Sequence, residues 1–302
     1  MKTALVTGAS GFLGQQICAL LKRSFLVVGV DLPSVKPIPQ IEWITVKSPD
    51  DLHRLVLGIN PEIVIHAAFI NRKPPGLNDN KYIDSVLSVD IPLFKTIAKN
   101  KIKLILISSS AVYGNAGGIN PIDESYPLDP VSIYGFAKKI QESTIQYYVP
   151  ECVCILRLFN LSGPCQKPGM LLPDWVKMAS EIANGKKRFM RVKNRITSRD
   201  FVDVRDVARA ISLVAAKFPF GEIMNVASGE AVSLMDISKE LQRICPVPLK
   251  FIEEDKDLQY SDVLIQRGSY EKLKLKFDWK PEISWQESLK DLWDSYIIEG
   301  YC

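Results

Sequence analysis

Two residues of one short stretch, Tyr134 and Lys138 in YGFAK, have the types and the spacing for proton transfer. The stretch follows a proline-containing loop and opens an expected helix, on which residues four apart share a face. An ammonium beside a phenol stabilises the phenolate, so we expect the pKa of Tyr134 to lie below the ordinary value of about 10. Such a phenol could exchange a proton with a hydroxyl or carbonyl group near neutral pH. Taken alone, this spacing is common, and a surface pair explains it better.

A serine stands where it could assist that phenol. The stretch SSSAVYG (108–114) follows an apolar run, and Ser109 lies 25 residues before Tyr134. In an open parallel sheet, ligands bind beyond the carboxyl ends of the strands. A serine hydroxyl at such an end could polarise the oxygen atom of a substrate.

Three glycines follow the first expected strand, at Gly8, Gly11 and Gly14 in TGASGFLG. The spacing differs from GxGxxG, but the physics is similar. Glycines permit a tight turn and a close approach of backbone N–H groups to a phosphate, and the following helix directs its positive end there. One glycine in a strand–helix turn is ordinary, whereas three at this spacing favour a pyrophosphate.

Asp31 ends the second expected strand, 17 residues after Gly14. A carboxylate there can accept hydrogen bonds from the adenosine ribose and would repel a 2′-phosphate. No arginine follows it closely, so we predict NAD rather than NADP. The alternative is an ordinary aspartate in a loop.

Apolar runs and amphipathic segments alternate over the first 160 residues. Such alternation predicts an α/β fold with a doubly wound parallel sheet. The expected strands cover 3–7, 25–30, 63–68, 103–108 and 152–158, and the expected helices lie near 12–23, 51–58, 85–99 and 134–147. Later segments predict helices near 174–184, at 204–217, at 234–244 and in the tail, and extended pieces at 199–204 and 222–228.

Composition excludes several classes of protein. The net charge is +4 without a basic run, so nucleic acid is not an expected partner. No stretch of about 20 apolar residues exists, so no membrane span is expected. The six cysteines form no CxxC motif and the chain has two histidines, so we expect no metal site. We expect these cysteines to be small core residues of a protein in a reducing compartment, the cytoplasm.

Six motifs, taken in order, resemble those of the extended short-chain dehydrogenase/reductase family of NAD-dependent epimerases and dehydratases. They are TGASGFLG, HAA, SSSAVYG, YGFAK, RLFNLSGP and SRDFVDVRDVA. The resemblance implies a Rossmann-type NAD-binding domain over 1–160, with segments around 197–227 returning to it. It also implies a smaller α/β lobe for a sugar nucleotide, mainly over 161–302.

The resemblance implies roles for individual residues. Ser109, Tyr134 and Lys138 match the family's catalytic triad. The residues expected to contact the cofactor are Gly8, Ser10, Gly11, Phe12, Leu13, Gly14, Asp31, Ala67, Ala68, Tyr134 and Lys138. The second half, including RVKN (191–194), is similar to GDP-4-keto-6-deoxymannose reductases, which implies substrate contacts by Ser110, Asn160, Arg191 and Arg199. The alternative for each arginine is a surface salt bridge.

The implied function is oxidoreduction of a nucleotide-diphosphate sugar, with reduction of a 4-keto-6-deoxyhexose at C4 and Tyr134 as proton donor. The alternative is a C4 epimerase that uses bound NAD⁺, and a third interpretation is a non-catalytic protein that senses NAD. Dehydration is disfavoured, because Ser110 and Ala111 stand where the family's dehydratases carry an acidic pair. The resemblance also implies a homodimer. Its paired helices would be the one near 85–99, before the fourth expected strand, and the one near 134–147, which contains Tyr134 and Lys138.

Overall fold

The computed structural model describes residues 2–33, 35, 37–71, 73–116, 120–193, 197–253 and 264–298. Its main feature is one parallel sheet with the strand order β11-β6-β5-β4-β1-β2-β3. The order reverses between β1 and β4, which is where doubly wound sheets bind ligands. The strands are β1 (Thr3–Thr7), β2 (Leu26–Asp31), β3 (Glu42–Thr45), β4 (Ile63–His66), β5 (Lys103–Ser109), β6 (Val153–Leu158) and β11 (Ile223–Val226).

Helices cover both faces of this sheet, as the apolar strands require. The helices α1 (Phe12–Leu21), α6 (Val204–Lys217) and α8 (Glu271–Phe277) pack over one face, where they share a core with Val6, Ile65 and Ile105. The other face is covered by α2 (Pro49–Ile59), α3 (Asp79–Asn100) and α4 (Ile133–Tyr148). The predicted α/β fold with a doubly wound parallel sheet is therefore confirmed.

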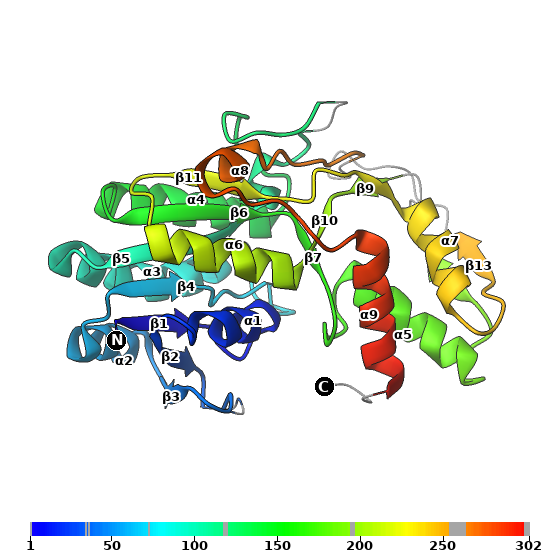
Figure 1. Cartoon of the computed structure of the whole chain (residues 1–302), viewed down its shortest axis with the longest axis horizontal. Coiled ribbons are helices and arrows are strands. Elements are labelled where there is room, and N and C mark those ends of the chain that lie inside the picture. The colour runs from blue at the N-terminus through cyan, green and yellow to red at the C-terminus, as the bar shows by residue number, and fades with distance from the viewer. Residues whose placement is uncertain are drawn as a thin grey trace.

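A second, smaller core lies beside the sheet, on the right of Figure 1. Its helices are α5 (Leu171–Ala183), α7 (Leu234–Ile244) and α9 (Trp285–Ile298), and α5 runs alongside α9. Three short strand pairs surround them: β7 (Asn160–Ser162) with β10 (Phe201–Asp203), β9 (Ser198–Arg199) with β12 (Val232–Ser233), and β8 (Met190–Val192) with β13 (Phe251–Glu253).

The chain passes between the two cores more than once. Of the segment around 197–227, α6 and β11 pack with the large sheet, whereas β9 and β10 pair with strands of the smaller lobe. The helix α8 and the buried Trp279 also belong to the core of the large sheet, although they lie far beyond residue 160. In Figure 1, β7 lies between the large sheet and the helices of the smaller lobe.

The cysteines do not all match the expectation. Cys18, Cys154 and Cys245 are buried free thiols, as expected of core residues, and Cys152 is a partly buried free thiol. Cys165 is disulfide-bonded, which the expectation of small core cysteines in a reducing compartment does not include. Cys302 lies outside the described residues, as does Asn194 of the RVKN stretch. Within the described ranges no helix is long and apolar enough to cross a bilayer, and no cluster of three or more metal-ligating side chains occurs.

Candidate active site

The glycine loop packs directly against the end of the neighbouring strand. Gly8 has φ +66°, and a Cβ built on it would lie 2.8 Å from backbone atoms of Ala68, which follows β4. A Cβ on Gly14 would lie 2.1 Å from the Gly8 carbonyl oxygen. Two of the three glycines are therefore required by the packing of the loop itself, and they bring the ends of β1 and β4 together.

The packing of the loop does not require a glycine at position 11 as strictly as at positions 8 and 14. Its φ of −65° is open to any residue, and a Cβ there would meet the Gly8 oxygen at 3.1 Å. It is the N-cap of α1, which has no side-chain cap and no acidic residue in its first turn. The first N–H groups of α1, at Phe12 and Leu13, therefore face no capping side chain from the helix. This arrangement suits the pyrophosphate of a dinucleotide, which needs exposed N–H groups and a close backbone approach.

Asp31 is tied to this loop. Its carboxylate accepts hydrogen bonds from the Ser10 N–H at 3.0 Å, the Ser10 hydroxyl at 2.6 Å and the Leu32 N–H at 2.9 Å. A carboxylate has about four acceptor positions, so one remains for a further donor such as a ribose hydroxyl. The structure thus places Ser10 as the support of Asp31, while Ala67 packs against the adjoining core.

Ser109 and Tyr134 meet at the end of the sheet. Ser109 is the last residue of β5 and precedes the 3₁₀ helix η1 (Ser110–Tyr113), and Tyr134 lies in the first turn of α4. The neighbouring Ser109 hydroxyl lowers the pKa of the phenol, but burial acts more strongly and raises that pKa overall. The prediction that Lys138 lowers the pKa of Tyr134 below its ordinary value is therefore wrong. Removal from water disfavours the phenolate more than the neighbouring groups stabilise it.

Lys138 lies beneath the tyrosine and is 3% exposed. Its ammonium donates to the Ile107 carbonyl at 2.8 Å and to Gln141 Oε1 at 3.1 Å. Burial lowers the pKa of this lysine to about 7, against the charges of Asp90 and Glu142, which raise it. Burial therefore moves the pKa values of Tyr134 and Lys138 in opposite directions, because the phenol is charged without its proton and the amine with it.

Phe69 connects the glycine loop with these residues, a role that the sequence patterns do not predict. It follows Ala68 directly, and its ring packs edge-on against Tyr134 with centroids 5.5 Å apart. The Lys138 ammonium lies 3.6 Å from the centroid of the same ring. The segment that packs on Gly8 thus continues into contact with both side chains, so the loop and the triad form one site.

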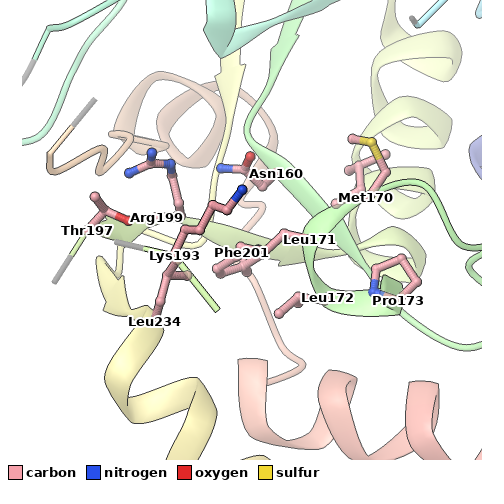
Figure 2. Close-up of a pocket in the computed structure, with 11 residues that line it drawn as sticks. Asn160, Met170, Leu171, Leu172, Pro173, Lys193, Thr197, Arg199, Phe201 and Leu234 are labelled. Atoms are coloured by element: carbon pink, nitrogen blue, oxygen red, sulfur yellow. The ribbon is translucent and has the colours of Figure 1, made fainter. Parts of the chain in front are cut away.

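A cavity of about 340 Å³ lies in the smaller lobe, shown in Figure 2. Its polar side chains are Asn160 from β7, Thr197, Arg199 from β9 and Lys193. The apolar wall consists of Leu161, Met170, Leu171, Leu172, Pro173, Phe201 and Leu234. The Lys193 side chain points toward Asn160 in Figure 2. Two cations beside an apolar wall suit a ligand that carries both phosphate and a flat or apolar group.

The predicted substrate residues divide into two groups. Asn160 and Arg199 share the cavity, whereas Arg191 is exposed on β8, stacks over Phe189 and does not line it. Lys193, two residues later, lines the cavity instead, and no sequence pattern singled it out. Ser110 is buried, and its carbonyl accepts a hydrogen bond from Gln266 at 3.4 Å.

Asp200 positions the polar wall of this cavity. Its buried carboxylate accepts hydrogen bonds from the N–H groups of Ser228, Gly229 and Gly268. Burial raises its pKa to about 6. Its carbonyl accepts from Asn160 Nδ2 at 3.0 Å, so Asp200 links Asn160 with the adjoining Arg199.

The sequence of the chain matches those of known proteins over most of its length. The sequence model of the NAD dependent epimerase/dehydratase family matches residues 4–227. GDP-6-deoxy-D-mannose reductase of Pseudomonas aeruginosa is 27% identical and aligns over 97% of this chain and 98% of its own length. UDP-glucuronate 4-epimerase of Thermodesulfobacterium geofontis is 28% identical, over 95% of this chain and 93% of its own.

Solved structures share the fold. UDP-glucose 4-epimerase of Thermus thermophilus, in complex with NAD, superposes with a TM-score of 0.83 at 23% identity, covering 97% of this chain and 98% of that one. The protein RMD of Pseudomonas aeruginosa, complexed with NADPH, superposes with a TM-score of 0.81 at 24% identity, covering 98% and 99%.

Proposed function

The chain belongs to the NAD-dependent epimerase/dehydratase family, and on that premise we propose that it reduces a nucleotide-diphosphate 4-keto-6-deoxyhexose at C4. The observation that carries this proposal is the meeting of Ser109, Tyr134 and Lys138 beside the glycine loop. In a non-catalytic protein nothing would require a phenol, a hydroxyl and a buried amine together at the carboxyl end of the sheet.

The residues of the chain have separate tasks in this reaction. Burial keeps Tyr134 protonated at neutral pH, which suits a group that must donate a proton to a carbonyl oxygen. The Ser109 hydroxyl, which lies near the phenol, can donate to the same oxygen. The Lys138 ammonium, which shares the Phe69 ring as a neighbour with Tyr134, would stabilise by its charge the phenolate that forms after the donation.

The cofactor would lie across the glycine loop. Gly8, Gly11 and Gly14 shape the loop, the first N–H groups of α1 would bind the pyrophosphate, and Asp31 would bind the adenosine ribose. When bound, a nicotinamide dinucleotide supplies or accepts a hydride. We propose NAD rather than NADP, since the fixed Asp31 carboxylate would repel a 2′-phosphate.

The nucleotide diphosphate of the substrate would occupy the cavity of the smaller lobe. Arg199 and Lys193 provide positive charge for the two phosphates, and Asn160 adds an amide. The Pseudomonas aeruginosa relative is named for a GDP-linked 6-deoxy sugar, and it aligns with nearly the whole chain. This likeness supports the 6-deoxy sugar and the reductase.

A C4 epimerase is the second candidate, because the Thermodesulfobacterium geofontis relative is a 4-epimerase of similar identity and coverage. The same triad would serve, with Tyr134 first accepting the proton of the C4 hydroxyl and later returning it. The difference lies in whether the cofactor is consumed.

Cofactor accounting separates the candidates. Purified protein is incubated with NADH and a set of UDP-, GDP-, dTDP- and CDP-sugars, including 4-keto-6-deoxy forms, while the absorbance of NADH and the product NMR spectrum are followed. We expect one NADH consumed for each product formed. Product without net loss of NADH would establish the epimerase, and binding of NAD without turnover of any sugar would support the sensor.

We further propose a homodimer formed by α3 and α4. On α4, Tyr147 is 81% exposed and Phe136 is 47% exposed, which leaves aromatic surface for a second copy. Light scattering should give twice the mass of the chain, and a monomer at working concentration would reject this pairing. The cytoplasmic location stays a prediction.

A further inference from the structure

A chain of buried hydrogen bonds runs from the lysine of the active site into the protein. The Lys138 ammonium donates to Gln141 Oε1 at 3.1 Å, and Gln141 Nε2 donates to Asp90 Oδ2 at 2.9 Å. The other oxygen of Asp90 is 3.0 Å from His66 Nε2. All four side chains are at most 3% exposed, so water does not compete for these bonds.

The chain continues to the cofactor loop. His66 Nδ1 lies 2.8 Å from Thr7 Oγ1, which accepts a hydrogen bond from the N–H of Ala68 at 3.2 Å. Ala68 is the residue that packs against Gly8. The same set of bonds therefore connects the active-site lysine with the loop between β4 and α3.

The carboxylate of Asp90 sets the direction of these bonds. It can only accept, so Gln141 must turn its NH₂ group toward Asp90 and its oxygen toward Lys138. For the same reason His66 presents a protonated Nε2 to Asp90, which leaves Nδ1 to accept from the Thr7 hydroxyl. With an uncharged amide at position 90, Gln141 could turn over and present a donor to the ammonium.

We propose that Asp90 is a positioning residue for Lys138: its carboxylate orients the Gln141 amide toward the ammonium, and its negative charge holds the proton on the lysine. The ammonium then has two acceptors, the Ile107 carbonyl and Gln141, and the Phe69 ring against a further face. Lys138 is thus held in one orientation near Tyr134, and the charge of Asp90 opposes the loss of its proton on burial.

Other charged groups near Lys138 do not replace Asp90. Glu142 is engaged by Arg157, whose guanidinium donates to both of its oxygens at 2.8–3.2 Å, so its charge is largely compensated. The titratable groups around Lys138 are Asp90 and Tyr82 on α3, His66 on β4, Tyr134 and Glu142 on α4, and Arg157 on β6. Glu142 is paired with the guanidinium of Arg157, whereas the hydrogen-bond partners of Asp90 are the His66 imidazole and the Gln141 amide.

The first test is Asp90→Asn, with Asp84→Asn as its control, since Asp84 is exposed on the same helix. The pH dependence of kcat/KM is measured in the reductive direction with the sugar nucleotide that the screen identifies. Wild type should lose activity as the pH rises through about 7, where Lys138 loses its proton. In Asp90→Asn the midpoint of this activity loss should move to a pH about 1 unit lower, because the negative charge that favours the protonated lysine is removed.

The shift produces a defect that depends on pH. Asp90→Asn can lose some kcat at every pH because Gln141 is free to turn over, but its activity relative to wild type should fall by about a further tenfold between pH 5.5 and pH 8, since one unit of pKa changes the protonated fraction about tenfold. Asp84→Asn should match wild type throughout. An Asp90→Asn variant with the same fractional loss at every pH would show a merely structural role and overturn the proposal.

A second variant separates orientation from charge. Gln141→Met has nearly the same volume and removes the connecting bonds, but it leaves the charge of Asp90. We expect it to lower kcat at every pH and to leave the pH of the activity loss close to that of wild type. A large shift of that pH in Gln141→Met, or unchanged kcat, would contradict the assigned role of the amide.

The rate measurements rest on the proposed function. A third measurement is therefore chosen that does not depend on it. The NMR titration of the Lys138 side chain in ¹³C-lysine-labelled protein, assigned with Lys138→Arg, needs no substrate. Asp90→Asn should lower the midpoint by about 1 unit. This shift in a protein that turns over no sugar would refute the proposed function alone, whereas an unchanged midpoint would refute the role of Asp90 in any case.

Discussion

The ammonium of Lys138 lies 3.6 Å from the centre of the Phe69 ring, and the edge of that ring contacts Tyr134. Phe69 follows the alanine that packs on Gly8, so one short segment contacts the cofactor loop, the phenol and the amine. A change in the segment after β4 should therefore alter both the packing of the glycine loop and the environment of Tyr134.

Replacement of the phenol tests catalysis directly. Tyr134→Phe should lower kcat by about 10²- to 10⁴-fold, the contribution of a general acid, while NADH still binds. Steady-state rates and titration of NADH fluorescence measure the two effects. Tyr126→Phe, on an exposed loop tyrosine, should retain activity. Unchanged turnover in Tyr134→Phe would remove this residue from the mechanism.

The buried lysine makes stability depend on pH. Burial lowers the pKa of Lys138 from 10.5 to about 7, so between these values the unfolded chain binds more protons than the folded one. The free energy of unfolding of wild type, relative to Lys138→Met, should therefore rise with pH in this window, by up to about 1.4 kcal/mol per unit. Chemical denaturation at pH 7, 8 and 9 measures the difference. A flat difference would mean that the lysine stays charged in the folded protein.

Asp31 should decide which dinucleotide is used. Asp31→Ser removes the charge that would repel a 2′-phosphate and should raise the ratio of kcat/KM for NADPH over NADH by at least about tenfold, or about 1.4 kcal/mol. Ser10→Ala is the matched control, because it removes the 2.6 Å hydrogen bond to Asp31 and keeps the charge. It should weaken both cofactors alike. Equal ratios in wild type and Asp31→Ser would contradict the assignment.

Two arginines of the smaller lobe should differ. Arg199→Ala removes a cation from the cavity and should raise the KM for the sugar nucleotide about 10- to 100-fold, the value of a hydrogen bond to a charged group. Arg191→Ala should leave KM close to that of wild type, since this side chain does not line the cavity. Inhibition by the free nucleoside diphosphate, which would compete for the same cavity, provides a second measure. The reverse order of effects would place the substrate elsewhere.

Two helical glycines should respond oppositely to a methyl group. A Cβ on Gly14 would lie 2.1 Å from the Gly8 oxygen, so Gly14→Ala should destabilise the fold by at least about 1–3 kcal/mol and weaken NADH binding. A Cβ on Gly58, in α2, would meet no other atom within 4 Å. Gly58→Ala should stabilise the protein by about 0.5–1 kcal/mol. Thermal unfolding measures both, and a stable Gly14→Ala variant would show that the loop can adjust.

Local sequence patterns predicted the frame of the site. Apolar runs and glycine spacing depend on neighbours along the chain, so they indicated the strand ends on which Ser109 and Asp31 lie and the loop around Gly11. Apolar runs do not predict the edge strand β3, because its four residues are at most partly buried and need not be apolar. The assignment of Arg199 to the substrate site also came from local sequence, because Arg199 lies within the continuous motif SRDFVDVRDVA.

The tertiary structure decided what depends on distant parts of the chain. The Tyr134–Lys138 spacing predicts proximity but not burial, and removal from water raised the pKa of the phenol that the spacing alone would lower. Lys193 lines the cavity and Arg191 does not, because β8 ends at Val192 and Lys193 lies outside the strand, where the alternation of side chains along β8 no longer applies. Asp90 and Gln141 meet because α3 packs on α4. Sequence spacing determines which residues share an element, whereas desolvation and contacts between elements arise only when the chain is packed.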